Sequence, residues 1–181
     1  EDMPSSIKGL GGIGLFPDQY YDLVDLGISN ITRNVVLNGV ISTETTSLSH
    51  DFNGKTYYFK RNYVERIDQL LTFCDQNDII VSFILLLPNG MTGEKRTWFI
   101  HPDATDGIYA LPNLNSEVGM EYYRATIDFL VKRYSRPDKK YGRVSRFIMH
   151  NEVDAHYVWT DAGDKPMPLY AELYQRSARM V

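Results

Sequence analysis

An apolar, strand-like segment that runs into polar and aromatic side chains occupies residues 146–159, RFIMHNEVDAHYVW. Its first part, Phe147 to Met149, has the character of a buried strand, and a histidine, an amide and a carboxylate follow at once. In parallel α/β folds, ligands bind at the carboxyl ends of the strands. The segment therefore predicts a parallel sheet with a candidate site at the end of this strand.

Strand-like segments alternate with helical patterns along the rest of the chain. The expected strands are residues 7–13, 31–37, 79–87 and 144–150. The expected helices run from Pro17 to Gly27, from an N-cap at Asn62 to Cys74, from Glu117 to Tyr134, and from Tyr170 to Met180. This alternation predicts parallel pairing with right-handed crossovers.

Two of the connections are unusually long. Residues 40–61 contain the turn signal Asn53-Gly54 between alternating segments, which predicts an inserted β-hairpin. Residues 88–115 are rich in Pro, Gly and Asp, and loops of that length are usually functional or disordered.

Four βα units in one domain, residues 1–181, fit two architectures. One is a small doubly wound sheet, and the other is the first half of a TIM (β/α)8 barrel. Residues 9–14, GLGGIG, miss the G-x-G-x-x-G spacing, and no acidic residue ends the second strand. The sequence therefore argues against a dinucleotide-binding sheet, and the predicted fold is the N-terminal half of a TIM (β/α)8 barrel.

Composition excludes several classes of partner. The net charge is −4, with Lys and Arg scattered, which argues against nucleic acid and anionic membranes. No apolar run reaches the roughly 18 residues of a membrane helix. A single cysteine, Cys74, rules out an intrachain disulfide. The chain begins at Glu1 without a signal-like segment, so we expect a processed protein or a piece of a longer one.

The Asn151-Glu152 pair resembles the end of the fourth strand in the clan A glycoside hydrolases, a group of (β/α)8 barrels. The surrounding sequence is most similar to an uncharacterised group of barrel-forming bacterial hydrolases. The resemblance implies a retaining glycosidase that acts on an oligo- or polysaccharide, needs no cofactor, and works outside the cytoplasm or in the periplasm. It assigns Glu152 as the acid/base and Asn151 as a sugar-binding amide.

The chemistry of Glu152 fits that role. Glycoside hydrolysis needs a proton donor for the leaving oxygen. An apolar approach, Phe147 to Met149, predicts surroundings of low polarity, which favour the protonated carboxyl that an acid near neutral pH requires.

Further residues are candidates for substrate contacts. Arg33 lies on an otherwise apolar strand, similar to a clan segment with a substrate-side arginine, and we expect it to pair with a catalytic carboxylate or with a strand-end one. His150 is expected to bond Glu152 or a sugar. Rings in the loops after the third and fourth strands can stack on sugars or anchor those loops: Trp98, Phe99, Tyr157 and Trp159.

Two departures from the clan pattern leave alternatives open. Val153 replaces the usual proline, and the clan's nucleophile belongs to a seventh strand, so it cannot be assigned here. The local carboxylates are Asp154, Asp161, Glu44 and Asp103. One alternative is a non-catalytic carbohydrate-binding half barrel, inactive alone and prone to self-association through its sheet edges. Another is a metal-dependent hydrolase that uses His150, Glu152 and His156.

Overall fold

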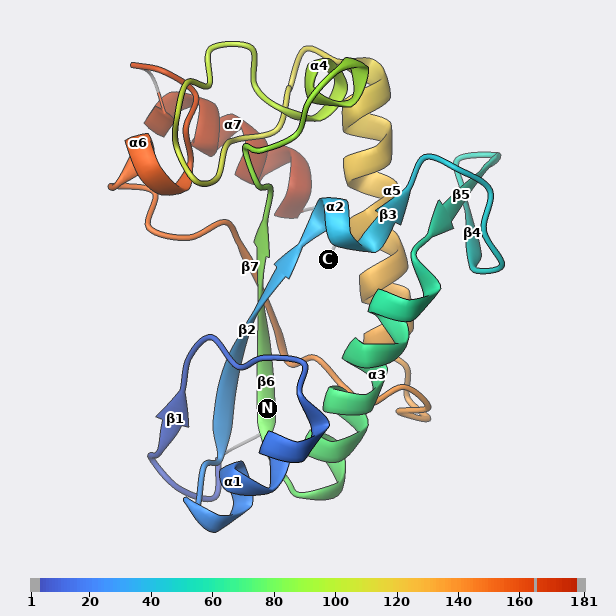
Figure 1. Cartoon of the computed structure of the whole chain (residues 1–181), viewed down its shortest axis with the longest axis vertical. Helices are drawn as coiled ribbons and strands as arrows, with labels where there is room; N and C mark the ends of the chain where they lie inside the picture. Colours follow the sequence, from blue (N-terminus) through green and yellow to red (C-terminus); the bar gives the residue numbers. More distant parts are fainter. Residues whose placement is uncertain (1–3, 165, 179–181) are drawn as a thin grey trace.

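A four-stranded parallel sheet forms the centre of the protein in a computed structural model that describes residues 4–164 and 166–178 (Figure 1). Its strands are β1 (Gly9–Leu10), β2 (Asn30–Val36), β6 (Ile80–Leu86) and β7 (Arg146–Met149), and they lie in chain order. Every neighbouring pair is parallel. The predicted α/β architecture with a parallel sheet is confirmed.

A helix follows each strand of this sheet. These helices are α1 (Tyr20–Asp25, after the 3-10 turn η1, Pro17–Gln19), α3 (Arg61–Gln76), α5 (Glu117–Tyr134) and α7 (Pro166–Ala178). Gly27 follows α1 with φ 64°, as its sequence position predicts. Asn62 was expected to cap α3, but the N-cap is Lys60, without a side-chain hydrogen bond. Met180, the expected end of the last helix, lies outside the described residues.

Three helices of four to six residues were not expected from the sequence. They are α2 (Leu37–Val40), α4 (Glu94–Phe99) and α6 (His156–Trp159). One or two turns carry too few residues to establish a helical period.

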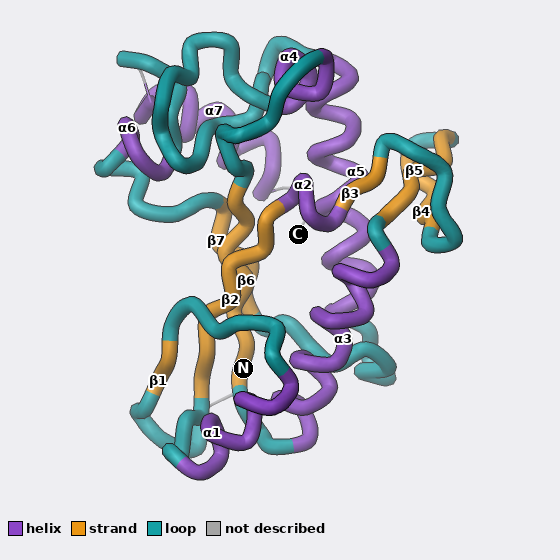
Figure 2. The backbone as a smooth tube through the Cα atoms, in the orientation of Figure 1, coloured by secondary structure: helices purple, strands orange, loops and turns teal. Residues whose placement is uncertain are grey.

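The predicted hairpin is confirmed and belongs to a second, antiparallel sheet. Strands β3 (Ile41–Ser42), β4 (Ser49–Phe52) and β5 (Lys55–Phe59) pair in the order β3-β5-β4. Asn53 and Gly54 make the turn with φ 50° and 76°. The hairpin extends away from the parallel sheet (Figure 2) and is attached to α5, where Phe59 stacks on Phe129 at 3.9 Å between ring centroids.

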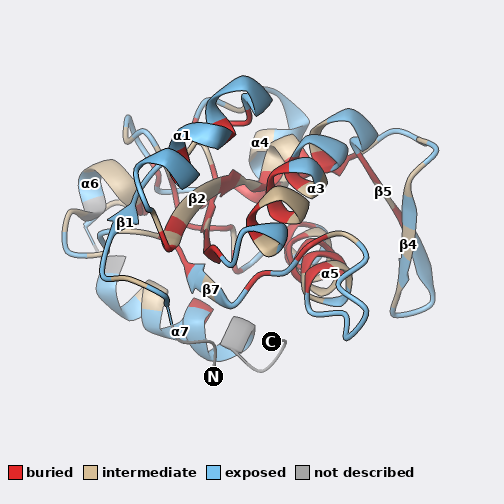
Figure 3. Ribbon diagram, turned by 90° about the horizontal axis from the view of Figure 1, so that it is seen from below, coloured by how far each residue is buried: buried red, intermediate tan, exposed pale blue. Residues whose placement is uncertain are grey.

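One face of the parallel sheet is buried under helices. Side chains on a strand alternate between faces, so Val81, Phe83 and Leu85 of β6 share one side, and all three are buried. The apolar sides of α3 and α5 belong to the same core, and Phe83 meets Tyr134 edge-on at 5.6 Å. Figure 3 shows the buried residues of these helices turned toward the sheet.

The opposite face of the sheet is open and mixed in character. Thr32 and Asn34 of β2 are half-buried, Arg146 of β7 is exposed, and Ile148 is 38% exposed. On the same face of β6, however, Ser82 and Leu86 are buried, so this face is only partly open.

The first strand is much shorter than the seven residues expected. Only Gly9 and Leu10 pair with β2. A Cβ at Gly9 would lie 2.5 Å from Oδ1 of Asn30, so the close approach of the two chains depends on glycine. The glycines that allow this contact also weaken the strand, because they add no side chain to the sheet.

A second close approach, between α4 and α5, gives a stability prediction. A Cβ at Gly119 would lie 1.7 Å from the carbonyl oxygen of Trp98, a backbone atom that cannot move aside alone. We expect Gly119→Ala to lower the free energy of unfolding by about 1–3 kcal/mol, measured by urea denaturation. Gly90→Ala is the control, since its Cβ would meet nothing within 4 Å. Equal stability of the two variants would contradict the packing described here.

Candidate functional site

Three connections leave the sheet at the same edge. Val36 of β2 is level with Leu86 of β6, and Met149 of β7 is level with Leu85. The hairpin insertion, the long loop and the segment after β7 therefore all begin at the carboxyl edge, where parallel sheets bind ligands.

The backbone after β7 adopts an unusual conformation. His150 and Glu152 have φ values of 63° and 43°, in the left-handed region that residues other than glycine seldom enter. The amide of His150 still donates to the carbonyl of Leu85 at 3.1 Å, so the turn begins directly at the end of the sheet. Such conformations cost about 1–3 kcal/mol each and tend to gather at functional sites.

Glu152 lies at the predicted strand end but not in the predicted surroundings. Its side chain is exposed and Asn151 is half-buried. The low polarity expected for a catalytic acid is therefore absent around Glu152 in the described structure, because Phe147 to Met149 place their apolar groups along the sheet rather than around the carboxylate.

His150 is buried and does not bond Glu152, one of the two partners expected for it. Its exposed fraction is 1%, and neither ring nitrogen has a hydrogen-bond partner. The imidazole meets the ring of Tyr170 edge-on at 6.4 Å, while the hydroxyl of Tyr170 donates to the carbonyl of Met149 at 2.9 Å. Burial lowers the pKa of His150 to about 4, so the ring is neutral at pH 7.

Arg33 does not make either of the expected ion pairs. Within residues 4–164 and 166–178 no carboxylate pairs with it, and its Nη1 donates to the carbonyl of Ile13 at 2.5 Å. It shares a face of β2 with the buried Ile31 and Val35. Its guanidinium therefore holds the connection after β1, on the helix-covered side of the sheet.

The two tryptophans stack on tyrosines of the protein itself. Trp98 is parallel to Tyr122 at 6.3 Å between centroids, and Trp159 is parallel to Tyr109 at 5.3 Å. These contacts match the loop-anchoring alternative for both rings. Tyr157, the third predicted sugar contact, is 67% exposed.

Asp161, one of the carboxylates noted in the sequence, organises the long loop. Its Oδ2 accepts from the amides of Thr105 at 2.7 Å and Gly107 at 3.0 Å, and its Oδ1 accepts from the amide of Gly163 at 3.2 Å. Burial alone would raise the pKa of this carboxyl, but the backbone donors outweigh it and the pKa is lowered. A carboxylate with this many donors is a structural anion rather than a proton carrier.

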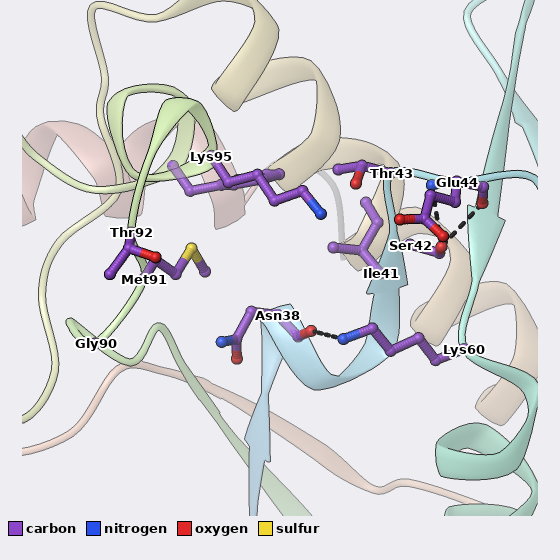
Figure 4. A pocket seen from close by; sticks show the side chains of 11 residues that line it. Asn38, Ile41, Ser42, Thr43, Glu44, Lys60, Gly90, Met91, Thr92 and Lys95 are labelled. Atoms are coloured by element: carbon purple, nitrogen blue, oxygen red, sulfur yellow. Dashed lines mark hydrogen bonds between the residues drawn. The ribbon is translucent and has the colours of Figure 1, made fainter.

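A pocket of about 460 Å³ lies at the carboxyl edge beside β2 and β6 (Figure 4). One wall consists of Asn38, residues 41–44 and Lys60, and the other consists of residues 90–92, Lys95 and Phe99. The Lys60 ammonium donates to the carbonyl of Asn38 at 2.8 Å. The Ser42 hydroxyl donates to the Glu44 carbonyl at 2.8 Å and accepts from the Glu44 amide. The Glu44 carboxylate has no hydrogen-bond or ion-pair partner among the described residues.

The sequence did not identify the two lysines of this pocket. Lys60 and Lys95 are ordinary surface residues in the sequence, 35 positions apart. Two features pointed to the edge pocket but not to its lysines. Both long connections start at the carboxyl edge of the sheet, and Glu44 lies within the first of these connections.

The described residues contain neither a metal-binding cluster nor a membrane-spanning helix. No three His, Cys, Asp or Glu side chains among them gather closely enough to hold a metal ion. The side chain of His156, one ligand of the metal-dependent alternative, lies outside the described residues. No helix in the described part of the chain is long and apolar enough to cross a membrane.

The fold and its polar edge pocket define an α/β protein with a pocket at the carboxyl ends of parallel strands. The chain belongs to DUF5722, a family of unknown function whose model matches residues 1–181. No curated protein and no solved structure matches it.

The buried imidazole gives a prediction for the pH dependence of stability. Because the folded pKa of His150 is below the ordinary 6.5, protonation favours the unfolded chain, and stability is lost as the pH falls from about 6.5 toward 4. Between pH 7 and 4.5 this group should remove about 2–3 kcal/mol of the free energy of unfolding. His150→Asn, which tolerates the left-handed backbone, should lack this part of the loss in urea titrations at the two pH values. Identical losses would show that His150 is not buried in its neutral form.

Proposed function

We propose that this chain forms the first half of a (β/α)8 barrel that binds and cleaves carbohydrate. Four consecutive parallel strands in chain order support the barrel, since a doubly wound sheet reverses its strand order at a switch point. The open sheet face, with Thr32, Asn34 and Ile148, corresponds to the barrel interior, which is filled by side chains once the barrel closes.

Exposed apolar side chains at the first and last βα units support the same proposal. Tyr21 and Val24 of α1 are 68% and 45% exposed, and Met167 and Tyr174 of α7 are 53% and 50% exposed. In a closed barrel the first and fourth helices each gain a neighbour from the second half. These positions are where such neighbours would pack.

The proposed activity is retaining glycoside hydrolysis with Glu152 as the acid/base. The observation that carries it is the left-handed backbone at His150 and Glu152, directly after the fourth parallel strand. Glu152, whose side chain is exposed, lies in the turn that follows the carboxyl end of β7, where the resemblance to the clan A enzymes expects the proton donor. Asn151, half-buried beside it, is the proposed sugar-binding amide.

The exposure of Glu152 is compatible with this role only in a completed barrel. A retaining mechanism needs a second carboxyl about 5–5.5 Å away. We assign that group and the low-polarity wall around Glu152 to the second half of the barrel. On this proposal the chain of residues 1–181 alone binds sugar and does not cleave it.

Non-catalytic carbohydrate binding is the second candidate function. It is favoured by a specific observation, namely that the edge pocket with Glu44, Lys60 and Lys95 is formed within this chain, whereas the surroundings of Glu152 are not.

Replacing the proposed acid tests the activity. In the full-length native protein, Glu152→Gln should lower turnover of natural glycosides by about two to four orders of magnitude, the range for a lost general acid. Activated aryl glycosides should lose much less, because their leaving groups need little protonation. Asp154→Asn, a change at an exposed neighbour, is the control. Equal losses on both kinds of substrate would argue against the acid/base role.

The half-barrel proposal also predicts self-association. Residues 1–181 in isolation should form dimers or larger species in sedimentation velocity experiments, through the open sheet face and the edges at β1 and β7. Ile148→Asn, on the open face, should shift the distribution toward monomer. A stable monomer of 20.8 kDa that hydrolyses a glycoside on its own would refute the proposal.

A further inference from the structure

The edge pocket carries a charge pattern that goes beyond a general sugar site. Two ammonium groups and one carboxylate line it, contributed by Lys60, Lys95 and Glu44. The Glu44 carboxylate forms no ion pair with either lysine, although all three line the same pocket. Opposite charges that line one pocket without pairing leave room for a ligand between them.

The ammonium groups are available to a ligand. Lys95 is exposed, and no residue in the described ranges provides it with a hydrogen bond or an ion pair. Figure 4 shows its side chain extending across the pocket toward Thr43. Lys60 uses one of its three donors on the Asn38 carbonyl, which fixes its position and leaves two donors unused.

The rest of the pocket suits a sugar ring. Ile41, Met91 and Phe99 provide apolar surface, while Thr43 and Thr92 provide hydroxyl groups. Sugars combine an apolar ring face with a polar rim, and a volume of about 460 Å³ lies within the usual range of ligand sites.

We propose that this pocket binds an anionic sugar unit, one that carries a single uronate carboxylate or sulfate ester, between the ammonium groups of Lys60 and Lys95. Two positive charges and one negative charge leave the pocket with a net charge of +1, which matches a singly charged unit. Glu44 accepts hydrogen bonds from the hydroxyl groups of the sugar that lie away from its anionic group. The inference rests on the proposed function, in that it names the substrate class of the same carbohydrate-binding edge.

Binding to residues 1–181 tests the proposal directly. The probes are oligomers of glucuronate and galacturonate, their neutral methyl esters, and a monosulfated neutral oligosaccharide. Affinity is measured by titration calorimetry, and the methyl resonance of Met91 reports whether the ligand enters this pocket. We expect at least one anionic oligomer to bind about tenfold more tightly than its neutral counterpart, with weaker binding as salt is added.

Substitutions of the charged side chains in the pocket should change the affinity for an anionic oligomer in opposite directions. Lys95→Gln should weaken binding of the anionic oligomer about tenfold and leave the neutral one unchanged. Glu44→Gln should strengthen anion binding, because Glu44 is the only carboxylate among the described residues that line the pocket. Lys140→Gln, at an exposed lysine near the opposite edge of the sheet, should change nothing. Preference for uronate over sulfate, or the reverse, identifies the source of the charge.

Two results would overturn the inference. One is equal affinity for charged and neutral oligomers, and the other is binding that Lys95→Gln does not alter. Both results can be distinguished from failure of the proposed function. The Glu152→Gln variant tests cleavage in the full-length protein, and it leaves the side chains of the edge pocket unchanged. Loss of binding in Lys95→Gln with no effect of Glu152→Gln would support the anion site and reject the catalytic role.

Discussion

The in-register parallel pairing of β2 with β6 is the constraint on which the other features depend. Seven residue pairs, from Asn30 with Ile80 to Val36 with Leu86, align the two strands along their whole length. Because the strands end level, the hairpin insertion and the long loop start side by side and face each other across the pocket. A slip of one residue would turn Phe83 and Leu85 to the open face and would also separate the walls that carry Lys60 and Lys95.

The turn after β7 places unfavourable backbone conformations at the same carboxyl edge of the parallel sheet. His150 and Glu152 both occupy the left-handed region, and the buried imidazole makes no hydrogen bond. A buried polar group without a partner is unfavourable, and so is each left-handed residue. Packing against Tyr170, whose hydroxyl holds the carbonyl of Met149, keeps this arrangement in place. The surrounding core therefore stabilises a turn that is unfavourable by itself and that contains the exposed Glu152.

The sequence predicted those parts of the fold that have a clear period or a turn motif. The helix from Glu117 to Tyr134, the strand around residues 80–86 and the Asn53-Gly54 turn were placed to within a residue. The site was predicted less well. A strand-end motif locates Glu152 in the chain but does not reveal how exposed its side chain is. In the same way, the sequence around Arg33 does not show whether its guanidinium bonds a carboxylate or a backbone carbonyl. Lys60 and Lys95 were not foreseen, since their proximity arises only from the level strand ends.

The contacts of the two tryptophans bear on the prediction that aromatic rings stack on a sugar. Trp98 and Trp159 stack on Tyr122 and Tyr109, so one face of each ring already serves to anchor its loop. Asp161 is likewise occupied by backbone donors of that loop. The described lining of the edge pocket includes none of these three residues. Its walls offer ammonium, hydroxyl and carboxylate groups beside the apolar surface of Ile41, Met91 and Phe99. Recognition there should therefore depend on charge and hydrogen bonding more than on stacking, and a loop held so firmly keeps Lys95 positioned opposite residues 38–44.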